Sequence, residues 1–167
     1  MADKKRNKDE KQEELVKYRD LVVATLDYYI DNKEMQIKTA DFDSTEHYKG
    51  LKTQTAEHYQ KGRLTRLKQW FRDLTEMHVD TGDLKFSKYL QDKTKYNIDI
   101  FKSCFQRVDK IIEKGNITTD NQFYDINIMV DQLCQTEPID NNKIEILNRL
   151  LSEYEQRKSR QTRKPTA

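Results

Sequence analysis

The amino-acid sequence predicts an all-α fold, a single-domain helical bundle of five or six helices with a long second helix. Apolar residues recur at steps of three and four through most of the chain, the spacing of amphipathic helices. Only four glycines and two prolines occur in 167 residues, too few for the frequent tight turns of a sandwich or barrel. No alternation of apolar and polar residues extends beyond a few positions, so no strand is expected.

A first helix is expected over residues 9–31, where an apolar stripe repeats at helical spacing. The stripe consists of Leu15, Tyr18, Val22, Leu26 and Tyr29. The stretch DNKEMQIKTADFDS then loses the period. Asp43, followed by Glu46, has the pattern of a capping box, so a second helix is expected to open there.

The second helix is expected to continue to about His78, because no proline interrupts it. Gly50 and Gly62 each weaken it by about 1 kcal/mol relative to alanine. Its second half has a dense apolar face, formed by Leu64, Leu67, Phe71 and Leu74. Its first half has a thin one, formed by Tyr48, Leu51 and Tyr59. A long helix with so thin a stripe is expected either to fray or to pack against a neighbour.

Two helices are expected in the middle of the chain. Gly82 ends the long helix, and Asp83 caps a short one with apolar positions through residue 90. The most strongly patterned segment, residues 100–112, is the expected central core helix and closes at Gly115.

Two further helices complete the predicted bundle. Thr119 and Gln122 form a capping box that opens the first of them, and Pro138 ends it. Asn142 caps the last helix, whose main apolar face is formed by Ile144, Leu147, Leu151 and Tyr154.

Charge is concentrated at the two ends. The net charge is +2, but residues 157–167 hold five positive charges and no negative ones, and residues 1–11 hold five positive and three negative charges. The sequence therefore predicts a disordered charged tail over residues 1–10, one bundle domain over residues 11–157, and a disordered basic tail over residues 158–167. A chain of this length suits one domain.

The cysteines and the apolar runs indicate a cytoplasmic protein. Cys104 and Cys134 each sit in an apolar helical pattern and form no paired motif, so both are interpreted as buried free thiols of a reducing compartment. The longest apolar run, near LVVATLDYYI, is far shorter than the roughly 20 residues of a membrane helix. No secretory signal is recognised at the start, and no cofactor is expected.

The thin stripe of the second helix favours a non-enzymatic function. We expect a regulatory or adaptor module that binds a protein partner or self-associates, and the candidate partner-binding residues are Tyr48, Leu51, Tyr59, Arg63, Arg66 and Trp70. Nucleic-acid binding is an alternative. Residues 44–73 hold seven basic residues against three acids. These basic residues and the basic C-terminal tail would contact the phosphate backbone of the nucleic acid. Against that, residues 116–156 hold eight acids against two bases, which could pair with the basic helix.

A second alternative is enzymatic. The segment RDLTEMH resembles the Arg-x4-6-His motif of HEPN-type nucleases, which are α-helical and cut RNA without a metal as dimers. The resemblance implies that Arg72 and His78 act around the scissile phosphate, with Asp73 as the accompanying polar residue. On one unbroken helix, Arg72 and His78 are turned about 240° apart, so they meet one site only if the helix ends between them.

The repeated triplet Glu-His-Tyr does not form a metal site by spacing. His47 and His58 share a helix face but lie roughly 16 Å apart along it, whereas a metal holds its histidine ligands at about 2 Å. No metal site is therefore expected.

Overall fold

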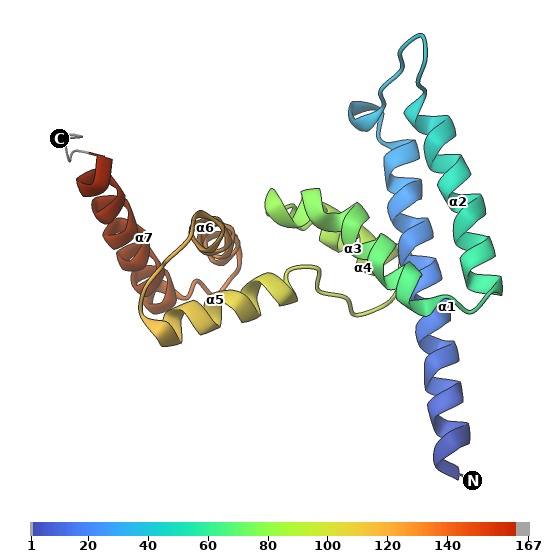
Figure 1. Cartoon of the computed structure of the whole chain (residues 1–167), viewed down its shortest axis with the longest axis horizontal. Coiled ribbons are helices and arrows are strands. Elements are labelled where there is room, and N and C mark those ends of the chain that lie inside the picture. Colours follow the sequence, from blue (N-terminus) through green and yellow to red (C-terminus); the bar gives the residue numbers. More distant parts are fainter. Residues whose placement is uncertain (1, 163–167) are drawn as a thin grey trace. The chain divides into compact units, whose positions relative to one another are not determined.

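The structure is a computed structural model that describes the backbone of residues 2–162 and the side chains of residues 9–160. These residues form seven α-helices and one short 3-10 helix, with a single isolated β-bridge and no strand (Figure 1). The all-α prediction is confirmed. Where one bundle was predicted, the described chain divides into two compact units. Unit 1 contains the chain up to Glu76 together with Lys85–Ile98, and unit 2 contains Met77–Leu84 and the chain from Asp99 onward.

Unit 1 is built around the first helix, α1 (Ala2–Asp31). The 3-10 helix η1 (Lys33–Met35) and a loop lead to α2 (Ser44–Gln60), which runs back alongside α1 (Figure 1). Helices α3 (Leu64–Asp80) and α4 (Leu84–Thr94) complete the unit, apart from their ends that belong to unit 2. The α1 stripe supplies the fully buried residues Leu21, Val22, Thr25 and Leu26.

Polar contacts fasten the other helices of unit 1 to α1. The Tyr29 hydroxyl donates to the carbonyl of Leu74 in α3. The Tyr96 hydroxyl, just beyond α4, donates to the Asp20 carboxylate at 3.0 Å. Phe86 of α4 is fully buried, and its ring lies edge-on to Tyr28 at 5.0 Å. The aromatic residues of α1 therefore anchor α3 and α4.

Unit 2 is a three-helix unit in which α6 (Asp120–Gln135) packs against both α5 (Lys102–Lys114) and α7 (Asn141–Thr162). Its core is formed by Val108, Ile111, Ile117, Ile126, Met129, Leu147 and Leu150. Local signals set some of its helix ends as the sequence predicts. Gly115 closes α5 in the left-handed conformation at φ 73°, and Thr119 caps α6 by accepting a hydrogen bond from the Gln122 N–H.

The prediction of one long second helix needs correction. The long second helix is interrupted at residues 61–63, so α2 and α3 are separate helices, which raises the count above the five or six expected. Helix α1 includes residues 2–10 and α7 includes residues 158–162, and the disorder of the two charged tails stays a prediction. No glycine or proline separates these residues from the adjacent apolar stripes, so nothing in the sequence ends the helices earlier. The remainder of the predicted C-terminal tail lies outside the described residues.

Candidate functional site

The tip of the loop between η1 and α2 presents two large apolar side chains to solvent. Ile37 is 60% exposed and Phe42 is 46% exposed. An antiparallel bridge joins Lys38 to Asp43, and the Ser44 N–H donates to the Ile37 carbonyl at 2.9 Å. Because side chains alternate across paired strands, this pairing puts Ile37 and Phe42 on one face and Lys38 and Asp43 on the other. We call residues 37–42 the loop tip.

Hydrogen bonds and an ion pair hold the loop tip in place. The Asp43 carboxylate caps α2 by accepting from the N–H groups of Thr45 and Glu46, at 3.0 and 3.3 Å. It also pairs with the Lys38 ammonium at 3.1 Å. Lys38, together with the Glu46 N–H, holds the pKa of the Asp43 carboxyl below its usual value. The cap and the ion pair therefore tie the loop tip to the start of α2.

A row of aromatic rings connects the loop tip to the interior of unit 1. The rings of Phe42 and His47 lie 5.7 Å apart, those of His47 and Tyr48 5.8 Å apart, and those of Tyr48 and Tyr29 5.2 Å apart. Tyr29 is buried. Such ring pairs add to burial energy, so the row supports Phe42 from behind while its outer surface stays in solvent.

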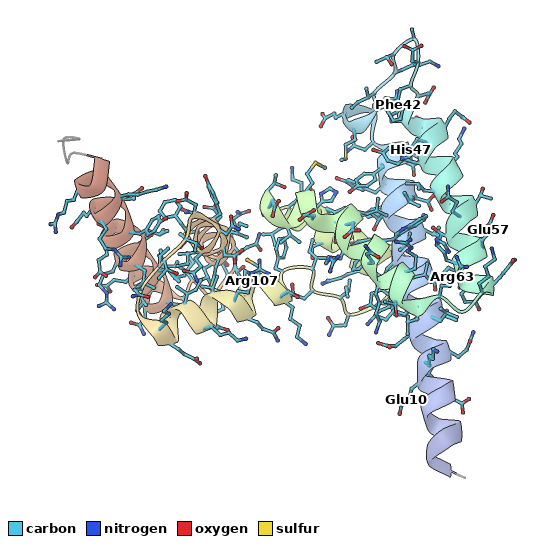
Figure 2. The ribbon with its side chains drawn as sticks, in the orientation of Figure 1. Glu10, Phe42, His47, Glu57, Arg63 and Arg107 are labelled. Atoms are coloured by element: carbon cyan, nitrogen blue, oxygen red, sulfur yellow. The ribbon has the colours of Figure 1, made fainter. Side chains whose placement is uncertain are left out.

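The opposite end of α2 carries positive charge. Lys11, Arg63 and Arg66 are exposed and line one depression of about 420 Å³. We call these three side chains the basic corner. Gly62, at φ 64°, makes the left-handed turn that brings Arg63 to the start of α3. Phe42 and Arg63 lie at opposite ends of α2 (Figure 2).

His58 lies beside the basic corner, whose positive charges contribute to a lowered pKa of its imidazole. The imidazole packs edge-on against Trp70, with ring centroids 4.9 Å apart. Burial, followed by the nearby guanidinium groups of Arg63 and Arg66, lowers the pKa of His58. The other repeated histidine, His47, lies in the aromatic row at the far end of α2, so the structure does not bring the two together.

The predicted partner-binding aromatic residues are engaged within unit 1. Tyr48 belongs to the aromatic row, and Trp70 contacts His58. The Arg19 guanidinium lies 4.4 Å from the centroid of the Tyr59 ring, a cation–π contact. Leu51 is half-buried on α2. Through Tyr48 and Tyr59, α2 contacts α1, and through His58 it contacts Trp70 of α3, so the thin stripe of α2 has neighbours within unit 1.

The two predicted arginines are exposed, as a binding role needs. Arg63 and Arg66 sit together in the basic corner, although the sequence does not show that Lys11 joins them. Sequence reasoning missed Ile37 and Phe42. The available signal was two large apolar residues in an aperiodic polar stretch directly before a capping box, where no helical face would bury them.

The structure separates the residues of the nuclease hypothesis. The Arg72 side chain is 76% exposed and bonds to the Asp73 carboxylate at 3.2 Å. His78 is buried, and its Nδ1 lies 2.9 Å from the Asp83 carboxylate, across the turn that Gly82 makes. Because α3 is unbroken from Leu64 to Asp80, Arg72 and His78 are turned about 240° apart and do not converge within one copy of the chain.

The two cysteines differ in their surroundings. Cys104 is buried, and its Sγ lies 3.5 Å from Oδ1 of Asp125, which Arg107 holds through two bonds of 2.7 Å. Burial, and then the Asp125 carboxylate, raises the pKa of the Cys104 thiol to about 12. Cys134 is exposed, which corrects the prediction of a buried thiol. Cys104, whose thiol has a pKa of about 12, is a poor nucleophile at neutral pH.

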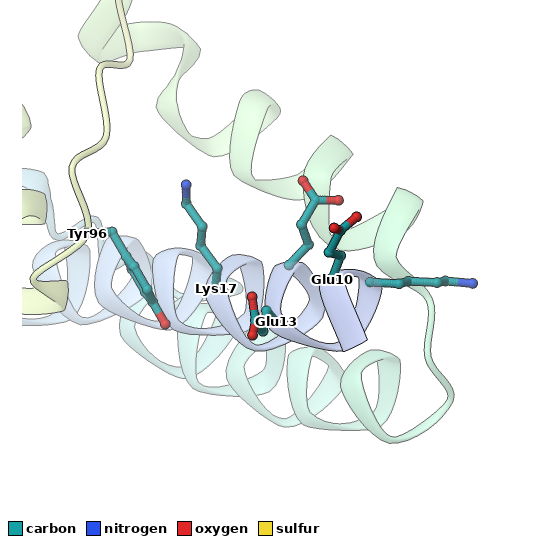
Figure 3. Close-up of a pocket in the computed structure, with 6 residues that line it drawn as sticks. Glu10, Glu13, Lys17 and Tyr96 are labelled. Atoms are coloured by element: carbon teal, nitrogen blue, oxygen red, sulfur yellow. The ribbon is translucent and has the colours of Figure 1, made fainter. Parts of the chain in front are cut away.

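A further depression, of about 610 Å³, lies along α1 (Figure 3). Glu10, Glu13 and Lys17 line it together with Tyr96 (Figure 3). The Lys17 ammonium lies 5.8 Å from the centroid of the Tyr96 ring. The side chains that line this depression are mostly charged and solvated, and none has the buried, paired arrangement of an acid–base site.

Among the residues that the structure describes, no group of three or more histidine, cysteine or acidic side chains is placed to hold a metal ion. Within the same part of the chain, no helix combines the length and apolar composition needed to cross a bilayer. No protein-family model matches the chain, and neither the curated proteins nor the solved structures contain a significant match to it.

Proposed function

We propose that the protein is a non-enzymatic binding module that docks a protein partner through the loop tip. The observation that carries the proposal is the exposure of Ile37 and Phe42 on one loop that backbone hydrogen bonds cross. Two of the five large apolar side chains that are exposed among the described residues lie on this one loop. Apolar side chains held in a fixed position lose little conformational entropy on binding, so they make good anchors.

The chemistry of the loop tip indicates the kind of partner. A protruding pair of apolar side chains needs an apolar pocket on the other protein. The depression along α1 is lined mostly by charged side chains, and the one at the basic corner is lined by three cations and mainly polar neighbours, so neither supplies such a pocket for a second copy. We therefore favour a different protein over self-association. Lys38 and Asp43, on the opposite face, would form a polar rim.

The non-enzymatic part of the proposal has its own support. The Cys104 thiol is buried with a pKa of about 12, and Arg72 and His78 point away from each other on α3. Neither arrangement matches an activated nucleophile or an acid–base pair.

The experiment compares partner capture by matched variants. Ile37→Asp with Phe42→Asp removes both anchors and is expected to weaken capture of the specific partner from a lysate of the source organism about 30-fold or more, because even one anchor residue contributes about 2 kcal/mol or more. Tyr124→Asp with Ile139→Asp is the control, since both residues are exposed apolar side chains outside the loop tip. All four substitutions are at exposed positions, so thermal unfolding should change little.

The outcomes are distinct. Proteins captured by the wild type and the control but lost with the loop-tip variant support the proposal. Equal capture by the loop-tip variant and the wild type contradicts it. Sedimentation over a range of concentrations tests the occupant separately. If the wild type forms a dimer and the loop-tip variant does not, the partner that the loop tip binds is a second copy of this chain and not a different protein.

A further inference from the structure

The basic corner concentrates positive charge from two helices on one spot of unit 1. Lys11 comes from α1, and Arg63 and Arg66 come from the start of α3. All three side chains are exposed and line the same depression. The Arg66 guanidinium donates one bond, at 3.2 Å, to the Gln69 side chain, which leaves most of its donors directed to solvent.

Acidic side chains lie near Lys11, since Glu10, Glu13 and Glu14 line a neighbouring depression together with it. Near the two arginines, the described acids of α2 and α1 pair with other lysines, Glu57 with Lys61 at 3.5 Å and Glu14 with Lys68 at 2.9 Å. The first turn of α3 contains no acidic residue. Among the described side chains, none of the three cations of the basic corner takes part in an ion pair. Burial is the main cause of the lowered pKa of His58, and the positive charges of Arg63 and Arg66 lower it further.

The number of cations indicates the class of anion. A carboxylate has one charge, and the fork of a single guanidinium satisfies it. A phosphate group has more acceptor oxygens and, as a monoester, a charge of about −1.5 to −2 at neutral pH, so it accommodates donors from several directions. Consecutive phosphodiesters of a nucleic-acid strand present the same chemistry along a line.

We propose that the basic corner is a second binding site, which holds the phosphate groups of a single-stranded nucleic acid or of a phosphorylated small molecule. It lies at the other end of α2 from the loop tip and is independent of the partner proposed there. Arg63 and Arg66 supply forked donors to phosphate oxygens, and Lys11 supplies a point charge from the facing helix.

The test measures binding of two probes by the full chain. The first probe is a fluorescently labelled single-stranded RNA of about 20 nucleotides, followed by anisotropy at several salt concentrations near 100 mM. The second is inorganic phosphate, followed by NMR of the arginine side-chain N–H groups. The variant is Arg63→Gln with Arg66→Gln. The control is Lys85→Gln with Lys88→Gln, which removes the same charge from exposed positions of α4.

For RNA, the basic-corner variant should bind about tenfold or more weakly than the wild type, because each lost charge-assisted contact weakens binding several-fold. The slope of log affinity against log salt should fall by about 1.4, since each phosphate contact on a single strand contributes about 0.7. The control should retain affinity within about threefold.

Each result decides the proposal. RNA binding that only the basic-corner variant weakens supports it and identifies a nucleic acid as the source of the phosphate. Absent RNA binding, with phosphate-induced shifts of the arginine signals that the variant loses, supports it and identifies a small phosphorylated ligand. Binding of neither probe, or an equal loss in variant and control, overturns it. Circular dichroism of both variants should match the wild type, because all four side chains are exposed.

Discussion

The surroundings of Cys104 lead to a quantitative prediction about thiol reactivity. In the Cys134→Ser variant, Cys104 is the one remaining thiol. With a pKa of about 12, its thiolate fraction at about pH 8 is on the order of 10⁻⁴, compared with about one quarter for an unperturbed cysteine of pKa about 8.5. The smaller thiolate fraction alone makes Cys104 react about 2,000-fold more slowly than an unperturbed cysteine. The greater nucleophilicity of a more basic thiolate restores about 40-fold, which leaves a slowing of about 60-fold.

Burial adds to this effect, because the Cys104 side chain is almost inaccessible to a reagent in the folded protein. The assay is reaction with an aromatic disulfide, followed by absorbance, for the folded Cys134→Ser variant and for the same variant in denaturant. We expect folded Cys104 to react at least about 60-fold more slowly than the denatured chain. The Cys104→Ser variant, which keeps the exposed Cys134, should react quickly in both states. If folded Cys104 reacts within about tenfold of the denatured rate, the packing of α5 on α6 around Asp125 is not as described.

Two further predictions concern the histidine and arginine of α3. Burial, only partly offset by Asp83, depresses the folded-state pKa of His78 below its usual value of about 6.5. The unfolded chain therefore binds the proton first, and the free energy of unfolding falls as pH drops from about 6.5 to the lowered pKa. Urea unfolding at about pH 7.5 and about pH 5 should show a smaller drop for His78→Gln than for the wild type, and an equal drop would contradict the assignment. Because Arg72 and His78 diverge, a labelled single-stranded RNA should stay intact in a chelator. Cleavage that Arg72→Ala or His78→Ala abolishes would restore the nuclease hypothesis.

Local sequence signals predicted several helix ends, because each depends on residues only a few positions apart. The prediction that Asn142 caps the last helix is wrong, because Asn142 lies inside α7 and the Asp140 carboxylate accepts from the Lys143 N–H at 3.0 Å. Asp43 caps α2, Thr119 caps α6, and Gly115 closes α5. The assignment of helices to units depends instead on contacts between distant residues. On α3, Phe71 packs edge-on against Tyr18 in unit 1, whereas the later residues of the same helix belong to unit 2. An apolar stripe shows that a face is buried and does not show what covers it.

The same dependence on contacts between distant residues explains which candidate site residues the structure leaves exposed and which it engages. The exposure of Arg63 and Arg66 follows from their charge. The engagement of Tyr59 depends on Arg19, which lies forty residues earlier, and no periodicity links the two. The exposure of Phe42 depends on the pairing of Lys38 with Asp43, which a single β-bridge creates.

The interruption between α2 and α3 has a physical reason that can be found in the sequence, in the direction of the two apolar stripes. Thr55 marks the buried side of α2, and Leu67 and Phe71 mark the buried side of α3. On one continuous helix, Leu67 and Phe71 would be turned about 120° and 160° away from Thr55, so the two stripes would face different directions. Both cannot then pack on α1 without a break. Of the two glycines in this stretch, Gly62 lies between the stripes and adopts the left-handed conformation that ends α2, whereas Gly50 precedes Thr55 and stays helical. The change in stripe direction requires the turn at Gly62, and this turn places Arg63 and Arg66 beside Lys11. The basic corner is therefore a consequence of the way in which α2 and α3 both pack on α1.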